Sequence, residues 1–209
     1  MDAPPIVKVA LMGVNRVDSA PALCYALHRF ICPHLECCVL TEIYLIRHGD
    51  PARDPAIPYN TLPGPNLSDR GRAEARQAAT FLAEKGLEQL FVSPFARTMQ
   101  TAEILAEQLG LPVIFTKLIQ EHGPGENDGQ VRERLREFLQ GAQDSAFTKI
   151  GLVTHGSPVR ATLLELSKNL IDLSKHSYLG GNPAPTCGIW QARWLNEHHI
   201  RFELVFKPV

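Results

Sequence analysis

The chain has 209 residues, of which 44% are hydrophobic and 21% charged, and its formal net charge at pH 7 is −1. This composition is ordinary for a globular protein and excludes wholesale disorder. The near-neutral charge argues against a general nucleic-acid binder, and no apolar run approaches the roughly 18 residues of a membrane span, so we expect neither nucleic acid nor membrane as a partner.

The first 40 residues differ from the rest. They hold four of the five cysteines and four scattered prolines, and they show no long helical period. We weigh three interpretations: a flexible leader, an added structural element, or sequence translated upstream of the true start, and we favour the first and the last. The sequence thus predicts an N-terminal extension over residues 1–40 and one domain over 41–209.

The cysteines also bear on location and metal content. An odd number gathered near one end disfavours a disulfide framework and favours a reducing, cytoplasmic compartment. The cluster between Cys32 and Cys38 lacks the paired spacing of a structural zinc site, so we expect no metal there.

From residue 41 onward, strand and helix patterns alternate. The expected strands cover 42–47, 89–92, 113–115 and 150–154, with a closing pair at 187–194 and 200–206. The expected helices run from Ser68 to about residue 85, over 96–109, around 131–139 after a glycine-rich loop at 119–130, and from Pro158 as a first helical residue. The pattern predicts a three-layer α/β/α fold whose central sheet is mostly parallel with an antiparallel edge.

Residues with chemical potential follow successive expected strands. In an open α/β sheet, ligands bind beyond the carboxyl ends of the strands. The residues delivered there are Arg47-His48-Gly49, Arg97, Glu121 and Thr154-His155-Gly156. A guanidinium group grips phosphate through a planar fork of donors, and a glycine after each histidine lets backbone N–H groups approach an anion. The sequence therefore predicts a phosphate site at this edge.

Each residue alone has a simpler interpretation. Arg47 to Gly49 could form a surface turn, His155 could be a buried histidine at a helix start, and Arg97 and Glu121 could be solvated. We favour a shared site because all of them follow strands of one sheet.

Together the motifs resemble the histidine phosphatase superfamily, also called the phosphoglycerate mutase-like fold. Arg47-His48-Gly49 is similar to its Arg-His-Gly signature, and Val153 to Gly156 is similar to its second histidine motif. The segments 66–73 and 93–102 resemble its leucine–Ser/Thr helix start and its Ser-Pro…Arg…Gln-Thr-Ala segment, and Glu121, Gly125 and Gly129 keep the spacing of a family loop. The resemblance covers about residues 41–206.

The resemblance implies a phosphohistidine mechanism with no metal or other cofactor. His48 would be the neutral nucleophile that forms a covalent phosphohistidine. Arg47, Arg97 and His155 would hold the phosphoryl oxygens, with His155 acting best as a cation, and Gly156 would offer a backbone N–H group. Glu121 would protonate the leaving oxygen and then activate water, which predicts an acidic-to-neutral pH optimum.

Two departures from the family pattern matter. Asp50-Pro51-Ala52-Arg53 replaces the segment that holds a phosphate-contacting Asn, so Arg53 is the candidate substitute. Only 34 positions separate Glu121 from His155, too few for the helical insertion that covers the substrate in sugar-phosphate mutases. The missing insertion favours a phosphatase with an open site over a mutase.

Several alternatives stay open. A phosphoglycerate mutase-type phosphotransferase is the runner-up, followed by a non-catalytic phosphate-binding pseudoenzyme. Glu126 and Asp128 are the other candidates for the acid, although we expect both to be solvated. The substrate is a small phosphorylated metabolite or a phosphoprotein, and the sequence specifies neither the substrate nor the oligomeric state.

Overall fold

The computed structural model describes residues 40–209. The predicted extension over residues 1–40 therefore lies, except for Leu40, outside the described part. The described chain forms one six-stranded sheet, in the order β3-β2-β4-β1-β5-β6. The strands are β1 (Glu42–Arg47), β2 (Gln89–Val92), β3 (Val113–Phe115), β4 (Lys149–Thr154), β5 (Ile189–Asn196) and β6 (His199–Phe206).

The sheet has the predicted mixture of directions. β1, β2, β3 and β4 run parallel to one another, whereas β5 pairs antiparallel with β1 and β6 pairs antiparallel with β5. The central strand β1 is buried at every position, as expected for a parallel strand with helices on both faces. The α/β class with an antiparallel edge is confirmed.

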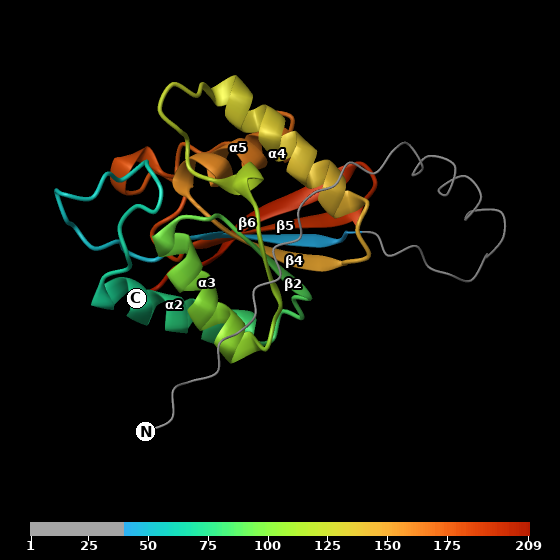
Figure 1. Cartoon of the computed structure of the whole chain (residues 1–209). Coiled ribbons are helices and arrows are strands. Elements are labelled where there is room, and N and C mark those ends of the chain that lie inside the picture. The colour runs from blue at the N-terminus through green and yellow to red at the C-terminus, as the bar shows by residue number, and fades with distance from the viewer. Residues whose placement is uncertain (1–39) are drawn as a thin grey trace, which may run out of the picture. The chain divides into compact units, whose positions relative to one another are not determined.

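Two helices cover each face of the sheet (Figure 1). α2 (Asp69–Leu82) and α3 (Ala96–Leu109) pack on one face, and α4 (Asp128–Gln143) and α5 (Gly156–Leu166) pack on the other. The core is accordingly divided into two clusters, one on each side of the sheet. The predicted apolar stripe of α2, which consists of Ala75, Ala78, Ala79 and Leu82, is fully buried in one of them.

Local signals explain the helix boundaries, with some corrections. The Ser68 hydroxyl accepts the Gly71 N–H group and starts α2 as predicted, but the helix ends at Leu82 rather than at residue 85, and Gly86 (φ +69°) lies in the turn that follows. α4 starts inside the expected glycine-rich loop, because Asn127 and Gln130 form a reciprocal capping box.

The start of α5 differs from the prediction in a way that bears on the site. His155 is the N-cap residue, so Pro158 occupies the third helical position and not the first. A proline is tolerated there because the first N–H groups of a helix have no intrahelical partner. His155 is therefore the single residue that connects the end of β4 to the start of α5.

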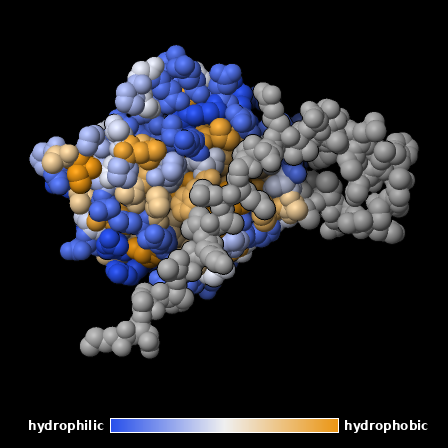
Figure 2. All heavy atoms as spheres, viewed as in Figure 1, coloured by the Kyte–Doolittle hydropathy of each residue, from blue (hydrophilic) through white to orange (hydrophobic). Residues whose placement is uncertain are grey.

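Figure 2 shows a mixed surface on this face of the molecule, with hydrophilic residues dense over α4. Exposed hydrophobic side chains include Ile57, Tyr59 and Leu62, all in the long loop between β1 and α2. Within residues 40–209, no helix has the length and apolar character needed to cross a bilayer.

Candidate active site at the carboxyl ends of β1 and β4

His48 follows β1 and is fully buried. Its backbone N–H donates to the Thr154 carbonyl (2.9 Å), and its own carbonyl accepts from the Cys187 N–H (3.1 Å). The ring nitrogen Nδ1 lies 2.8 Å from the Gly49 carbonyl oxygen, an acceptor that requires a proton on Nδ1. The lone pair of the neutral ring is therefore on Nε2.

His155 follows β4 and is also fully buried. Because β1 and β4 are adjacent and parallel, their ends bring the two imidazole rings together, with centroids 5.2 Å apart in an edge-to-face arrangement. The His155 Nε2 lies 2.8 Å from the Ser93 hydroxyl, while Nδ1 is buried without a hydrogen-bond partner among the described residues.

The environment of both rings favours the neutral form. Burial is the main cause that lowers the pKa of His48 well below 6.5, and the positive charges of Arg97 and Arg47 lower it further. Burial, then His48 and the same two arginines, likewise lower the pKa of His155. This opposes the expectation that His155 is a cation, because the protein's own charges penalise a proton there; a phosphate dianion would act in the opposite sense.

Arg47 and Arg97 lie beside the histidines with donors to spare. Arg47 donates from Nη1 to the Ala184 carbonyl (2.8 Å), and Arg97 donates from Nη1 to the Tyr59 carbonyl (3.0 Å). Within the described chain, three nitrogens of these side chains are buried and have no hydrogen-bond partner: Arg47 Nε, Arg97 Nε and Arg97 Nη2. Buried guanidinium N–H groups are costly to leave unpaired, so their arrangement suits an anion that accepts from them.

The Arg97 guanidinium is held between two aromatic rings. Its central carbon lies 4.2 Å from the Tyr59 ring centroid and 4.6 Å from that of Phe95. Burial lowers the pKa of Arg97, and Tyr59 is the first influence that raises it again. The side chain is fully buried, so the simpler interpretation of Arg97 as a solvated helix residue is wrong.

Glu121 reaches the same site from the segment between β3 and α4. Its Oε2 lies 3.8 Å from His155 Nδ1, and its Oε1 accepts the His122 N–H (3.0 Å). The segment is tied to the end of β4, where the Thr154 hydroxyl donates to the Ile119 carbonyl (2.5 Å). The Glu121 side chain is 11% exposed, so it is in contact with solvent.

The alternative acids lie elsewhere. Glu126 forms an ion pair with Arg134 (Oε1 to Nε, 2.7 Å), so the expectation that it is solvated is wrong. Arg134 also donates to the Leu118 carbonyl and thereby fixes the segment that carries Glu121. Asp128 is exposed at the start of α4.

Of the two remaining predicted residues, Gly156 lies at the site and Arg53 makes no hydrogen bond with it. Gly156 is the first residue of α5, and a Cβ there would stand 1.4 Å from the Asn182 Oδ1 atom, so any larger residue would require the Asn182 side chain to move. Arg53 is exposed in the loop after β1 and makes no side-chain hydrogen bond to another described residue. The structure thus brings together His48, His155, Arg47, Arg97, Glu121 and Gly156, whereas Arg53 makes no hydrogen bond or ion pair to any of them.

Three further residues contribute to the site, although the sequence analysis assigned them no role. Tyr59 places its hydroxyl 3.3 Å from His48 Nε2, and Ser93 contacts His155. The Thr101 hydroxyl accepts the Gly49 N–H (3.1 Å) and so fixes the backbone beside His48. Ser93 and Thr101 lie within a motif already recognised, whereas Tyr59 lies in a loop with no pattern of its own.

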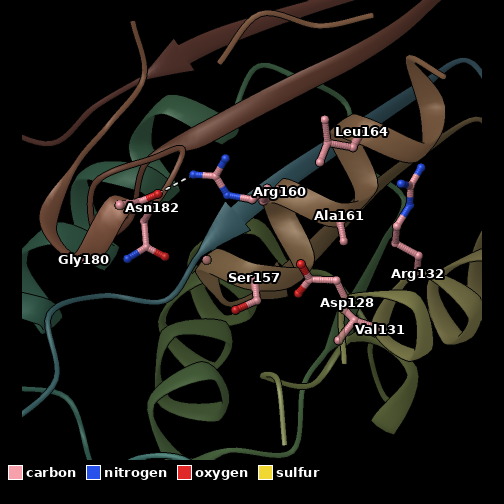
Figure 3. Close-up of a pocket in the computed structure, with 11 residues that line it drawn as sticks. Asp128, Val131, Arg132, Ser157, Arg160, Ala161, Leu164, Gly180 and Asn182 are labelled. Atoms are coloured by element: carbon pink, nitrogen blue, oxygen red, sulfur yellow. Dashed lines mark hydrogen bonds between the residues drawn. The ribbon is translucent and has the colours of Figure 1, made fainter. Parts of the chain in front are cut away.

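A pocket of about 220 Å³ lies at the start of α5, where Gly156 is the residue that it shares with the site (Figure 3). Its walls come from α4, α5 and the 3₁₀ helix η2 (Leu179–Gly181). Arg132, one of two arginines in the lining, is paired with Glu165 (2.9 Å). The other, Arg160, donates to the Gly181 carbonyl, and no described carboxylate pairs with it. The pocket offers a basic group beside Gly156 and Ser157.

Comparison with known proteins gives the context of this geometry. Residues 43–130 match the family model of the histidine phosphatase superfamily (branch 1). Phosphoserine phosphatase 1 of Hydrogenobacter thermophilus is 33% identical over 98 residues, which are 47% of this chain and 46% of that protein. GpmB of Escherichia coli, named as a probable phosphoglycerate mutase, is 30% identical over 41% of this chain and 40% of its own length. The matches thus span less than half the length of these curated relatives.

Solved structures extend the likeness over more of the chain. The mycobacterial glucosyl-3-phosphoglycerate phosphatase superposes with a TM-score of 0.64 at 20% identity, covering 80% of this chain and 99% of that one. SixA of Agrobacterium tumefaciens, a candidate phosphohistidine phosphatase by its name, gives 0.58 at 20% identity, with 79% and 96% covered. These establish the phosphoglycerate mutase-like fold, and residues 43–130 are similar to the histidine phosphatase superfamily (branch 1).

Proposed function

We propose that the chain is a metal-independent phosphatase that hydrolyses phosphomonoesters through a covalent phosphohistidine on His48. One observation carries this proposal. The Gly49 carbonyl holds the proton on His48 Nδ1, which leaves the Nε2 lone pair beside the unpaired, buried donors of Arg47 and Arg97. A nucleophile and an anion site therefore coincide, and the two positive charges disfavour a divalent cation at the same place.

The first half-reaction forms a phosphoenzyme. The Nε2 lone pair attacks phosphorus while the bond from phosphorus to the leaving oxygen breaks. The Glu121 carboxylic acid gives its proton to that oxygen, and the alcohol leaves. The positive charge on the imidazole is stabilised by the Nδ1–H bond to the Gly49 carbonyl, and the guanidinium groups stabilise the spreading charge on the three phosphoryl oxygens.

The second half-reaction returns the enzyme to its starting form. The Glu121 carboxylate takes a proton from water, and the water oxygen attacks phosphorus. The bond from phosphorus to Nε2 breaks, its electron pair returns to the ring, and inorganic phosphate leaves. Glu121 ends protonated, ready for the next substrate.

His155 has a supporting role in this scheme. Its unpaired Nδ1 is the ring atom nearest to Glu121, and its Nε2 is held by Ser93. A dianionic phosphoryl group would raise the pKa of this imidazole and favour a proton shared with an oxygen of the phosphoryl group. His155 then supplies positive charge only when substrate is bound.

The structure favours hydrolysis over transfer between substrates. Within the described residues, the stretch between β3 and α4 contains only a short 3₁₀ helix, η1 (Lys117–Ile119), and α4 is the only helix between Glu121 and His155. Water therefore reaches the phosphoenzyme. The substrate is a small phosphorylated metabolite or a phosphohistidine of a partner protein, and the pocket beside Gly156 is where its organic part would lie, with Arg160 as the basic contact.

The experiment that tests this function is phosphoenzyme trapping. The wild-type chain, incubated with a ³²P-labelled phosphomonoester and a chelator, should acquire an acid-labile, base-stable label and release inorganic phosphate. His48→Ala should acquire no label and lose turnover, whereas His198→Ala, an exposed histidine in the β5–β6 turn, should behave as wild type.

Other results would redirect the proposal. Activity lost with the chelator would overturn the metal-independent mechanism. Label that passes to a second substrate molecule faster than to water would identify a mutase. Phosphate binding without any label would identify a non-catalytic phosphate-binding protein.

A further inference from the structure

Tyr59 is the residue that lies directly over the nucleophile. Its hydroxyl is 3.3 Å from His48 Nε2, and since that nitrogen carries the lone pair, the hydroxyl donates. The side chain comes from the loop between β1 and α2 and is 42% exposed, unlike the fully buried histidines. It forms the boundary between the buried site and solvent.

The loop that carries Tyr59 is built around Arg97. The Tyr59 carbonyl accepts from Arg97 Nη1 (3.0 Å), and the Tyr59 ring lies on the guanidinium at 4.2 Å. Further along, Gly64 adopts φ +69°, and a Cβ there would stand 2.8 Å from the same Nη1 atom. The Pro63 carbonyl accepts the Ala96 N–H at the start of α3. The backbone of the loop is therefore anchored at Tyr59 and again at Pro63.

The hydroxyl and a reacting phosphoryl group need the same place. An attacking atom and its target must approach to about 3–3.5 Å along the lone pair before reaction. The Tyr59 hydroxyl already occupies that direction at 3.3 Å. Phosphorus can reach His48 Nε2 only after the hydroxyl leaves it.

We propose that Tyr59 is a positioning residue whose hydroxyl holds the His48 Nε2 lone pair and is displaced by each incoming phosphoryl group, while its carbonyl keeps Arg97 in place. This inference rests on the proposed function. Displacement costs one hydrogen bond at every binding event. The same hydroxyl competes with the product for this place, so Tyr59 weakens the binding of inorganic phosphate and promotes its release.

The proposal makes opposite predictions for two substitutions. Tyr59→Phe removes the competing hydroxyl and keeps the ring, so the dissociation constant of inorganic phosphate should fall about two- to tenfold, the value of one net hydrogen bond. Tyr59→Ala also removes the ring from Arg97, so phosphate should bind at least about threefold more weakly than to Tyr59→Phe. Tyr178→Phe, a change at a half-buried tyrosine in a different loop, is the control and should match wild type.

Calorimetric titration of the full chain with inorganic phosphate measures these constants without turnover. Wild-type chain that binds no phosphate would overturn the proposed function and this inference with it. Wild-type binding with unchanged or weaker phosphate binding in Tyr59→Phe would overturn only the inference, and weaker binding would show that the hydroxyl donates to the phosphoryl group instead.

Kinetics give a second, independent readout. With a small phosphomonoester, Tyr59→Phe should lower KM by the same factor as the phosphate dissociation constant, without raising the rate of phosphoenzyme formation more than about threefold. A KM that stays at the wild-type value while phosphate binding tightens would contradict a shared place for hydroxyl and substrate.

Discussion

Arg97 shows how a single residue can have a function that its neighbours in the sequence do not reveal. It lies on a helix, where an arginine is ordinarily solvated, yet it is fully buried between Tyr59 and Phe95 with two unpaired nitrogens. A buried charge without a carboxylate partner destabilises the fold. An anion that accepts from both nitrogens would offset that cost, and this links the residue to phosphate binding.

Arg97→Lys should separate charge from geometry. The ammonium keeps the positive charge but loses the planar fork and the stacking, so kcat/KM should fall about 10- to 100-fold, the loss of one charged hydrogen bond or more. Arg76→Lys, at an exposed position on α2, should leave kcat/KM unchanged. Steady-state assays with one ester measure both, and equal activity of Arg97→Lys and wild type would contradict a forked contact to phosphate.

Glu121→Gln should impair the reaction in proportion to the need for an acid. With an alkyl phosphate, whose leaving oxygen requires a proton, kcat should fall about 10²- to 10⁴-fold. With an aryl ester that leaves as a stabilised anion, burst kinetics should show near-normal phosphoenzyme formation followed by slow hydrolysis. Glu137→Gln on the exposed side of α4 is the control. An equal loss of phosphoenzyme formation for both esters would exclude Glu121 as the acid.

At the scale of elements, two close contacts set the position of the nucleophile. Adjacent parallel strands β1 and β4 bring His48 and His155 to one edge. Beyond β1, the backbone passes very close to α2. A Cβ on Gly49 would stand 2.5 Å from the Gly71 carbonyl oxygen. A Cβ on Gly71 would stand 2.2 Å from the Asp50 carbonyl oxygen. Glycine is needed at both because backbone meets backbone.

Gly71→Ala should therefore destabilise the fold although alanine is the better helix former. We expect a loss of about 1–3 kcal/mol, the usual cost of overpacking, together with reduced activity because residues next to His48 must shift. Gly141→Ala in α4 meets nothing within 4 Å and should instead stabilise by about 0.5–1 kcal/mol. Urea unfolding of the two variants compares them directly, and equal midpoints would contradict the close contact.

For the whole molecule, the two buried histidines make folding depend on pH. Their pKa values lie well below 6.5 in the folded chain, so below that pH the unfolded chain binds protons that the folded chain does not. The free energy of unfolding should then fall as the pH drops below about 6.5, by up to about 1.4 kcal/mol per pH unit for each histidine. Their contribution is fully present above that pH.

Urea unfolding at pH 7.5, 6.5 and 5.5 measures this dependence. His155→Gln should reduce the slope by about half, and His198→Gln, which changes an exposed imidazole, should leave it as in wild type. Stability that is constant or greater at pH 5.5 than at pH 7.5 would contradict buried neutral rings.

The order of elements and the residues at the strand ends could be predicted from the amino-acid sequence. Strands such as 89–92 and 113–115 and the helix 96–109 have the predicted bounds, because apolar periodicity and glycine stops are local signals. The end of α2, the start of α4 and the position of Pro158 within α5 departed from prediction, because helix ends depend on caps and on how a strand enters the helix.

The surroundings of those residues could not be predicted, because they depend on how distant segments pack together. Contacts between segments that are not adjacent in the chain bury Arg97 and place the Tyr59 hydroxyl beside His48. They also pair Glu126 with Arg134, whereas Arg53 is exposed to solvent. The tautomer of His48 and the unpaired donors beside it follow from the same contacts. Periodicity specifies which face of an element is buried, whereas the partner of each buried polar group is fixed only when the elements pack.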